Sequence, residues 1–430
     1  MQDILKRYWW IIAAVLMLIV VAFSLLEPPP PKHVTMAAGA QGGAYMATSE
    51  KYHALLADDK VTLEVLETNG SVDNLQKLLA GEADIAILQT GIASEAHADE
   101  LYSLGAVYFE PLWVFHRVGL EVRDLRDLEG AAIAVGAEGS GARALSDLVL
   151  AENGLNAQNA SLVSEGGRNA ADALLSGQVD AALLVAGPEA SWVKDLVANP
   201  SIELYSMQRA LAYARRYPYL KDVVLPDGAL DLSADLPSED VSLIAPSAQI
   251  VVHKDLHPAI HAVLLDAMNE SHGGGSLLTA PKTFPNPVLT DLPLSSEAKR
   301  YYERGPSFLR RYFSFAMANF LDRAWVLLIP LATLLVPIVR AGPPLYRWRI
   351  RRRIYVWYRD LRQLEEEGRS ATSIKDRHRV RADLARLQEE TGKVLVPDSY
   401  TDDLYRLRAH IRFVAELLDK LGEEDAAARI

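Results

Sequence analysis

Two glycine-rich segments each lead into a predicted helix, and their residue types suit the binding of an anion. The first segment, residues 39–45, contains Gln41, Gly42, Gly43 and Tyr45. Glycine lets the backbone approach a ligand closely, and the free N–H groups at the start of a helix can hold a carboxylate. The Tyr45 side chain could stack on such a ligand or form a hydrogen bond with it.

The second segment, residues 136–143, contains Ser140, Gly141 and Arg143. The Arg143 guanidinium could form a bidentate pair with a carboxylate, or it could lie on the solvent side of its helix. Gly-Ser-Gly at residues 139–141 resembles part of a phosphate loop, but no Gly-Lys-Ser/Thr follows and no dinucleotide pattern is present. The segment therefore predicts a carboxylate contact and excludes a nucleotide loop.

Other polar residues stand at the expected ends of strands. Gln89 and Thr90 follow an apolar run at residues 84–88, so their side chains would project from the end of a strand. Asn69 and Ser71 precede a predicted helix, with Ser71 as its N-cap, and capping alone would also explain them.

An internal repeat explains the spacing of these loops. Residues 78–91 and 174–187 match at seven positions with a constant offset of 96, which pairs Gly91 with Gly187. The loops at residues 39–42 and 136–139 match at an offset of 97. Each half therefore predicts the order strand, glycine loop, helix, strand, helix, strand.

The pattern predicts an α/β protein of two similar lobes. Apolar runs at residues 34–38, 61–66, 84–88 and 131–135 are typical of buried parallel strands, and they alternate with helices. We place one lobe at residues 34–112 and 242–304 and the other at 113–241. Because ligands of open parallel sheets bind at the carboxyl ends of strands, we expect the solute between the lobes, and we add Gly187 to the candidate ligand-binding residues.

Composition and charge exclude several classes of function. The chain has 430 residues, no cysteine and a formal charge of −12. No disulfide, thiolate metal site or cysteine nucleophile is therefore possible. Residues 341–430 carry 19 basic and 16 acidic residues, so the rest of the chain is strongly acidic, which argues against nucleic acid as a partner. The histidines show no metal-ligand spacing, and we expect no cofactor and no enzymatic activity.

Two apolar runs predict membrane spans. Residues 9–26 carry no charge and follow Lys6 and Arg7, which favours an uncleaved anchor over a signal peptide, because no small-residue cleavage site ends the run. A proline-rich spacer follows at residues 27–33. Residues 324–340 form a second, shorter run, and a buried helix of a soluble domain is the alternative reading. The arginines and aromatic residues beyond it favour a span with a cytoplasmic C-terminal side.

These spans would place residues 1–8 and 341–430 in the cytoplasm and the lobes outside a bacterial inner membrane. Residues 305–323 would form a juxtamembrane helix, lying on the bilayer or packed on the lobes. The C-terminal tail shows amphipathic spacings that predict a helical hairpin or short coiled coil. It could contact a permease, associate with a second copy, or have no partner.

Several motifs in order resemble the TAXI family of TRAP-transporter solute receptors. They are the segments at residues 42–45, 70–75, 81–89, 108–112, 127–130, 135–143 and 179–181. The resemblance implies a class II periplasmic-binding fold that closes on a small carboxylate, such as a dicarboxylate or an amino-acid-like compound, and delivers it to a permease. It adds Glu110 to the candidate ligand-binding residues.

The chain departs from the family at some of these positions. Ala44 and Ala142 stand where threonine is usual, and Thr90-Gly91 stands where Ser-Asp is common, so the substrate is left open. Typical members also lack the second span and the tail. The sequence predicts a membrane-tethered solute receptor, with a transmembrane solute sensor that signals through its tail as the alternative.

Overall fold

In the computed structural model the chain forms two units, one of Glu27–Asp322 and one of Met1–Leu26 with Arg323–Ile430. The structure describes residues 17, 30–306, 308, 315–371, 373–394, 396 and 400–427. Apart from Met17, the predicted cytoplasmic N-terminus and first span lie outside these residues. So do residues 27–29 of the predicted spacer and residues 307 and 309–314 of the predicted juxtamembrane helix.

Five strands form the sheet of the first lobe, in the order β2-β1-β3-β12-β4. β1, β2 and β3 are parallel, and β12 runs antiparallel to β3 and β4. The strands are β1 (His33–Ala37), β2 (Thr62–Leu66), β3 (Ile85–Gln89), β4 (Leu101–Phe109) and β12 (Ser247–His253). The predicted strands at 34–38, 61–66 and 84–88 correspond to β1, β2 and β3.

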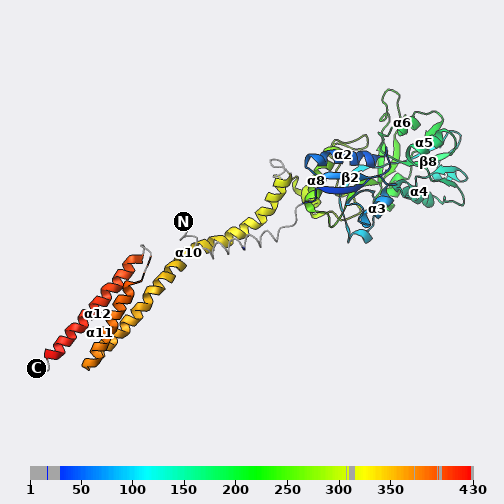
Figure 1. The fold of residues 1–430 in the computed structure, drawn as a ribbon. Helices are drawn as coiled ribbons and strands as arrows, with labels where there is room; N and C mark the ends of the chain where they lie inside the picture. Colours follow the sequence, from blue (N-terminus) through cyan, green and yellow to red (C-terminus); the bar gives the residue numbers. More distant parts are fainter. Residues whose placement is uncertain are drawn as a thin grey trace. The chain divides into compact units, whose positions relative to one another are not determined.

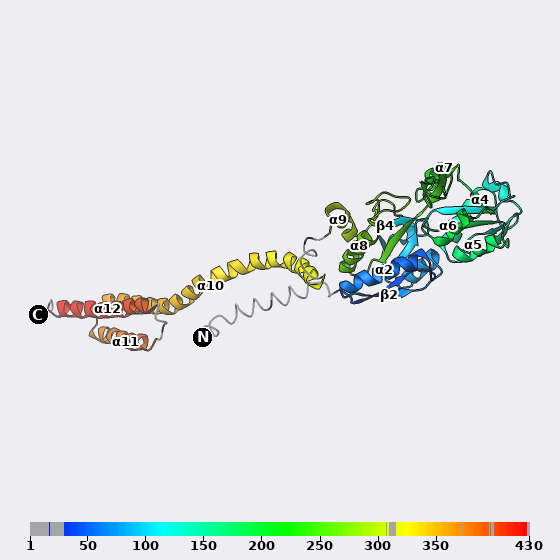
Figure 2. The same cartoon turned by 90° about the horizontal axis from the view of Figure 1, so that it is seen from above.

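Alternate side chains of these strands enter two apolar cores on opposite faces of the sheet. Met36 and Ile87 pack with α2 (Ala44–Asp58), α8 (Pro258–His272) and α9 (Ser296–Arg304). Ala86 and Leu88 pack with α3 (Ser71–Leu79). Burial on both faces explains why β3 reads as a continuous apolar run, and Figures 1 and 2 show helices around the strands.

The second lobe repeats this plan. Its strand order is β10-β11-β5-β8-β6-β7, with β9 also paired to β5. The strands are β5 (Leu112–Arg117), β6 (Ala132–Ala134), β7 (Ser161–Val163), β8 (Ala181–Val185), β9 (Ile202–Leu204), β10 (Lys221–Leu225) and β11 (Val241–Ala245). One face packs on α4 (Gly141–Glu152) and α7 (Ala210–Arg216), the other on α5 (Gly167–Leu175) and α6 (Ser191–Val197). The predicted two-lobed α/β fold is confirmed.

The repeat in the sequence corresponds to a repeat in hydrogen bonding. In the first lobe an Asp84 carboxylate oxygen accepts from the Thr35 N–H at 2.8 Å. In the second, an Asp180 oxygen accepts from the Ala132 N–H at 2.9 Å. Each aspartate precedes one strand, β3 or β8, and thus joins it by a hydrogen bond to the parallel strand beside it, β1 or β6. The shared aspartate is therefore structural.

The chain crosses between the lobes twice. The first crossing lies between β4 and β5, at Glu110 and Pro111, and the second lies at Pro246, between β11 and β12. Leu112 and residues 242–245 belong to strands of the second sheet, although the sequence-based boundaries placed them in the first lobe. The boundaries shift because β5 and β11 hydrogen-bond within the second sheet.

Among the residues that the structure describes, three helical segments of the second unit pack together. The C-terminal part of α10 (Phe315–Ser370) packs with α11 (Ile374–Gly392) and α12 (Thr401–Ala427) (Figures 1 and 2). Their shared core includes Ile354, Leu361, Val380, Leu384, Leu387, Leu404, Leu407, Ile411 and Val414. The tail is a bundle of three helical segments instead of the predicted hairpin or short coiled coil, because Ile354 and Leu361 of α10 supply a third apolar stripe.

The predicted second span, residues 324–340, lies within α10. Among the residues that the structure describes, no helix combines the length and apolar character needed to cross a membrane.

We expect Asp180→Ala to destabilise the two-lobed unit by about 1–3 kcal/mol, because it leaves the Ala132 N–H without its acceptor. Gln178→Ala, at an exposed position two residues away, is the matched control. Urea unfolding followed by tryptophan fluorescence, to which the buried Trp113 on the strand next to β8 contributes, measures the difference. Equal midpoints for the two variants would contradict this role.

Candidate functional site

The candidate site lies where the start of α3 meets the loop before α4. The backbone N–H groups of Val72 and Asp73, in the first turn of α3, donate to the Gly139 carbonyl of the second lobe at 3.1 and 3.3 Å. The Gln89 side-chain amide donates to the Gly141 carbonyl at 3.1 Å. Both contacts join the carboxyl-end loops of one lobe to those of the other, where the sequence analysis expects the solute.

A buried hydroxyl network lies behind these contacts. The Tyr45 hydroxyl donates to a carboxylate oxygen of Glu110 at 2.8 Å and lies 3.0 Å from the Ser71 hydroxyl. The Ser71 hydroxyl also accepts from the Gln89 backbone N–H at 2.9 Å. Four candidate residues, namely Tyr45, Ser71, Gln89 and Glu110, are therefore joined in one network.

This network corrects the predicted helix cap. α3 begins at Ser71, and Gly70 is its N-cap residue, with no side-chain cap. Ser71 does not cap the helix because its buried hydroxyl is bonded to Tyr45 and to the backbone of Gln89. The N–H groups of the first turn bond instead to the Gly139 carbonyl.

Glu110 is a carboxyl group in an unusual electrostatic environment. Its exposed fraction is 6%. Burial raises the pKa of Glu110 from its ordinary value to about 7, and the hydrogen bond from Tyr45 opposes that rise. Burial and the Glu110 charge together raise the pKa of Tyr45 well above its usual range, so Tyr45 stays a donor. Near neutral pH the site can therefore gain or lose one negative charge.

Thr90 bonds both to the second crossing between the lobes and to the second lobe itself. Its backbone N–H donates to the Ser247 carbonyl at 2.8 Å, and its hydroxyl accepts from the Ser247 N–H at 2.9 Å. The same hydroxyl donates to the Tyr219 carbonyl of the second lobe at 3.2 Å. The Glu110 N–H donates to the Pro246 carbonyl at 2.9 Å, which pairs the two crossing segments.

Glycines allow the lobes to approach closely at the site. A Cβ on Gly141 would lie 2.8 Å from the Gln89 side-chain oxygen. Gly70 has a φ of +117°, and a Cβ there would lie 3.3 Å from the Ser140 Cα. A Cβ on Gly139 would lie 3.3 Å from the Asn69 Cβ, so Asn69 and Ser140 also stand at the contact.

Arg143 is held within its own lobe. Its Nε lies 2.9 Å from both carboxylate oxygens of Asp147, one turn along α4, and a terminal nitrogen donates to the Ser164 hydroxyl at 2.9 Å. Ser140 is the N-cap of α4, accepting from the Arg143 N–H. The Arg143 side chain therefore has partners apart from the Tyr45 network, because Asp147 lies one helical turn away on the same face.

The remaining candidates lie apart from this network. Gln41 and Gly42 are exposed, and Gly43 is the N-cap residue of α2. Gly187 lies beside Glu189 before α6, where a Cβ would be 2.9 Å from that carboxylate. None of these four has a hydrogen bond to Tyr45, Ser71, Gln89 or Glu110 among the described residues.

Sequence reasoning missed two groups at the junction. The Gly139 carbonyl is a backbone atom, and only its glycine-rich context could have drawn attention to it. Tyr219 lies in a segment between α7 and β10 that carries no glycine motif. Its ring would be 2.5 Å from a Cβ on Gly91, so it closes the Thr90 side of the site.

The two similar lobes, the paired crossings and a polar site between the carboxyl ends of the strands define a two-lobed α/β fold like that of periplasmic binding proteins. The model of the NMT1-like family matches residues 36–303 of this chain, so the chain belongs to that family. The narrower TAXI assignment is not established by this match.

Several solved structures resemble the chain in part. A protein from Bordetella bronchiseptica RB50 is 18% identical, with a TM-score of 0.41 over 57% of this chain and 72% of that one. A putative L-cystine ABC transporter from Listeria monocytogenes is 14% identical, with a TM-score of 0.37 over 57% of this chain and 93% of that one. An amino acid ABC transporter substrate-binding protein from Streptococcus pneumoniae, bound to L-arginine, is 15% identical. Its TM-score is 0.36 over 57% of this chain and 91% of that one. Likenesses at this level carry no argument about the solute.

The raised pKa of Glu110 predicts a pH dependence of stability. The folded protein keeps this proton up to about pH 7, whereas the unfolded chain releases it near the ordinary value of 4.5. Between these values the folded state binds more protons than the unfolded chain. The free energy of unfolding therefore falls as pH rises from about 4.5 to about 7, by about 3 kcal/mol at most, and it levels off above pH 7.

Glu110→Gln should remove this part of the pH dependence. Urea unfolding at pH 5 and pH 8 measures the change in each protein, and the difference between wild type and variant isolates Glu110 from other titrating groups. An identical pH dependence in both proteins would show that Glu110 is ionised throughout the range.

Proposed function

We propose that the two-lobed unit is a solute-binding receptor that captures a small amino-acid-like anion between its lobes. The observation that carries this proposal is the Gly139 carbonyl at the first turn of α3. A carbonyl oxygen there occupies the position that a ligand carboxylate oxygen would take at a helix N-terminus. Separation of the lobes would release the two N–H groups for a solute.

Glu110 favours a solute that also carries an amine. One tyrosine hydroxyl bridges Glu110 and Ser71, so a buried carboxyl lies near the start of α3. A zwitterion could place its carboxylate on the α3 N–H groups and its ammonium on Glu110, which that ammonium would keep ionised. A dicarboxylate would bring a second negative charge towards Glu110 and would need that group protonated. Amino-acid-like solutes therefore fit better than dicarboxylates above neutral pH.

The two paired crossings support capture by closure. Residues at Glu110–Pro111 and at Pro246 are the backbone connections between the lobes, and hydrogen bonds join them. Rotation about such a pair changes the distance between the loops while leaving each sheet intact. The solute would bind between open lobes and be enclosed when they meet.

We expect the full-length chain to bind at least one member of a panel of amino acids, measured by calorimetry at pH 8. Glu110→Gln should weaken that binding about tenfold or more, because a charge-assisted contact is lost. Tyr45→Phe should weaken it less, since it removes one hydroxyl. Glu239→Gln, at an exposed position, is the matched control.

A panel without any binding solute would contradict the receptor function. Binding of dicarboxylates alone, unchanged by Glu110→Gln, would keep the receptor function but contradict the amino-acid-like class.

We further propose that the receptor is tethered to a bacterial inner membrane, with the lobes outside, and hands its solute to a TRAP-type permease. The support is in the sequence: the uncharged run at residues 9–26, the run at 324–340 with arginines beyond it, and the TAXI-like motifs. A tethered receptor should stay in the membrane pellet after carbonate extraction. Loss of residues 1–26 together with release into the soluble fraction would show a cleaved leader.

A further inference from the structure

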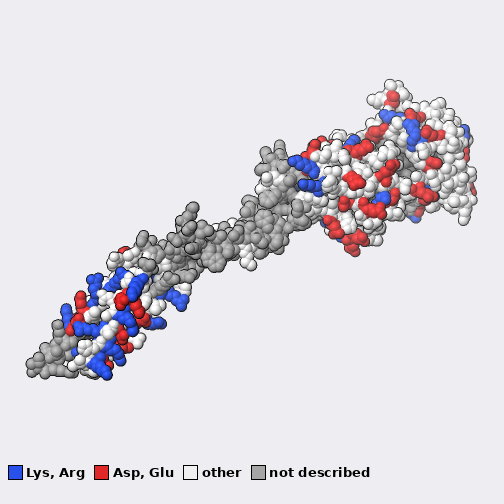
Figure 3. Space-filling model, in the orientation of Figure 1, with Lys and Arg blue, Asp and Glu red and all other residues white. Residues whose placement is uncertain are grey.

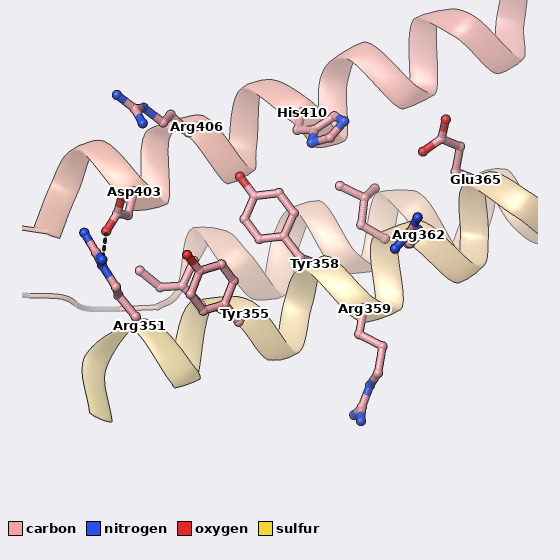
Figure 4. Close-up of a pocket in the computed structure, with 11 residues that line it drawn as sticks. Arg351, Tyr355, Tyr358, Arg359, Arg362, Glu365, Asp403, Arg406 and His410 are labelled. Carbon is pink, nitrogen blue, oxygen red and sulfur yellow. Dashed lines mark ion pairs between the residues drawn. The ribbon is translucent and has the colours of Figure 1, made fainter. Parts of the chain in front are cut away.

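The helical unit contains a groove of about 700 Å³ between α10 and α12. This volume is within the range of sites for small molecules, which is about 300–1,000 Å³. The groove belongs to the tail and has no part in the interlobe site. Its lining combines arginines, aromatic rings and a few apolar side chains (Figure 4).

The charges that line the groove do not cancel. Four arginines line it, at positions 351, 359, 362 and 406, against two carboxylates, Glu365 and Asp403, which leaves a net charge of +2 without His410. Figure 3 shows basic and acidic side chains closely mixed over this unit.

Both carboxylates already have basic partners. An Asp403 oxygen lies 3.5 Å from the Arg351 Nε, and Glu365 pairs with Arg369, outside the groove, at 2.7 Å. Arg362 and Arg406 have no ion-pair partner within the part of the chain that the structure describes. In Figure 4 the Arg406 side chain points outward from α12, at the rim of the groove. Two guanidinium groups thus remain for an external anion.

Aromatic rings form a row along the same groove. The ring centres of Tyr355 and Tyr358 are 6.2 Å apart, and those of Tyr358 and His410 are 5.9 Å apart. Tyr358 extends from α10 towards α12, on which His410 lies (Figure 4). Ile354 and Leu361 add apolar surface. Ring faces beside guanidinium groups suit a planar aromatic ligand that carries an anionic group.

We propose that this groove binds a small planar aromatic anion, with a nucleoside monophosphate as its representative chemistry. The rings would contact the base and a free arginine the phosphate. A single phosphate matches the modest charge of +2, and the sequence has no glycine loop of the kind that cradles polyphosphates. The proposal assigns a ligand site to the tail and is independent of the solute bound by the lobes.

Calorimetry on the full-length chain with AMP, adenosine and inorganic phosphate tests the proposal. We expect AMP to bind at least tenfold more tightly than either adenosine or phosphate, because only AMP uses both the rings and the arginines. The affinity should also fall as salt is added, since the contact with phosphate is ionic.

Variants locate the binding. The double variant Arg362→Gln with Arg406→Gln should weaken AMP binding at least tenfold, and Tyr355→Ala, at a 62% exposed ring, should weaken it without opening the bundle core. Arg412→Gln is the matched control, because Arg412 is an exposed arginine of α12 that does not line the groove. Circular dichroism confirms that each variant is folded.

Three outcomes would overturn the proposal. They are no binding of AMP, binding that the double arginine variant leaves unchanged, and binding that Tyr45→Phe removes while the tail variants keep it. The last result would place AMP between the lobes.

Discussion

The first turn of α3 has backbone N–H groups that need acceptors, and the two-lobed unit is organised around this requirement. Gly70 precedes the helix and supplies no side-chain cap, and the Ser71 hydroxyl is bonded elsewhere. The acceptor comes from the other lobe, as the Gly139 carbonyl. Because two N–H groups of this helix start are bonded across the lobe junction, opening of the lobes would free them for the proposed anion site.

Glu110, the buried carboxyl at the crossing between the lobes, gives this junction a group that titrates near neutral pH. Glu110 is part of the connection itself, and its side chain bonds to Tyr45, which in turn lies against Ser71. Its raised pKa follows from burial, since water cannot reach the charge to stabilise it. The same desolvation would strengthen a contact with an ammonium group, because a pair of opposite charges is screened less in such a place.

The tail differs from the lobes in the side chains that it presents. Its three helical segments share one apolar core, and the surface between α10 and α12 is left with arginines whose carboxylate neighbours pair elsewhere. The lobes therefore meet through backbone groups, the Gln89 amide and the Thr90 hydroxyl, whereas the tail presents guanidinium groups and rings. The two proposed sites of the chain thus differ in ligand chemistry.

The sequence by itself determined the repeat, the two lobes and several of their parallel strands, because helix and strand periodicity are local and the repeated aspartates occupy equivalent turns. Residue patterns also selected Tyr45, Ser71 and Gln89, each next to an element end, and the family resemblance added Glu110. Only the tertiary structure decided how they are used. Arg143 is bound by Asp147 and Ser164, Gly139 contributes a backbone carbonyl, and Tyr219 closes the Thr90 side. These outcomes depend on which loops of separate lobes come together, and no local pattern encodes contacts between segments so distant in the chain.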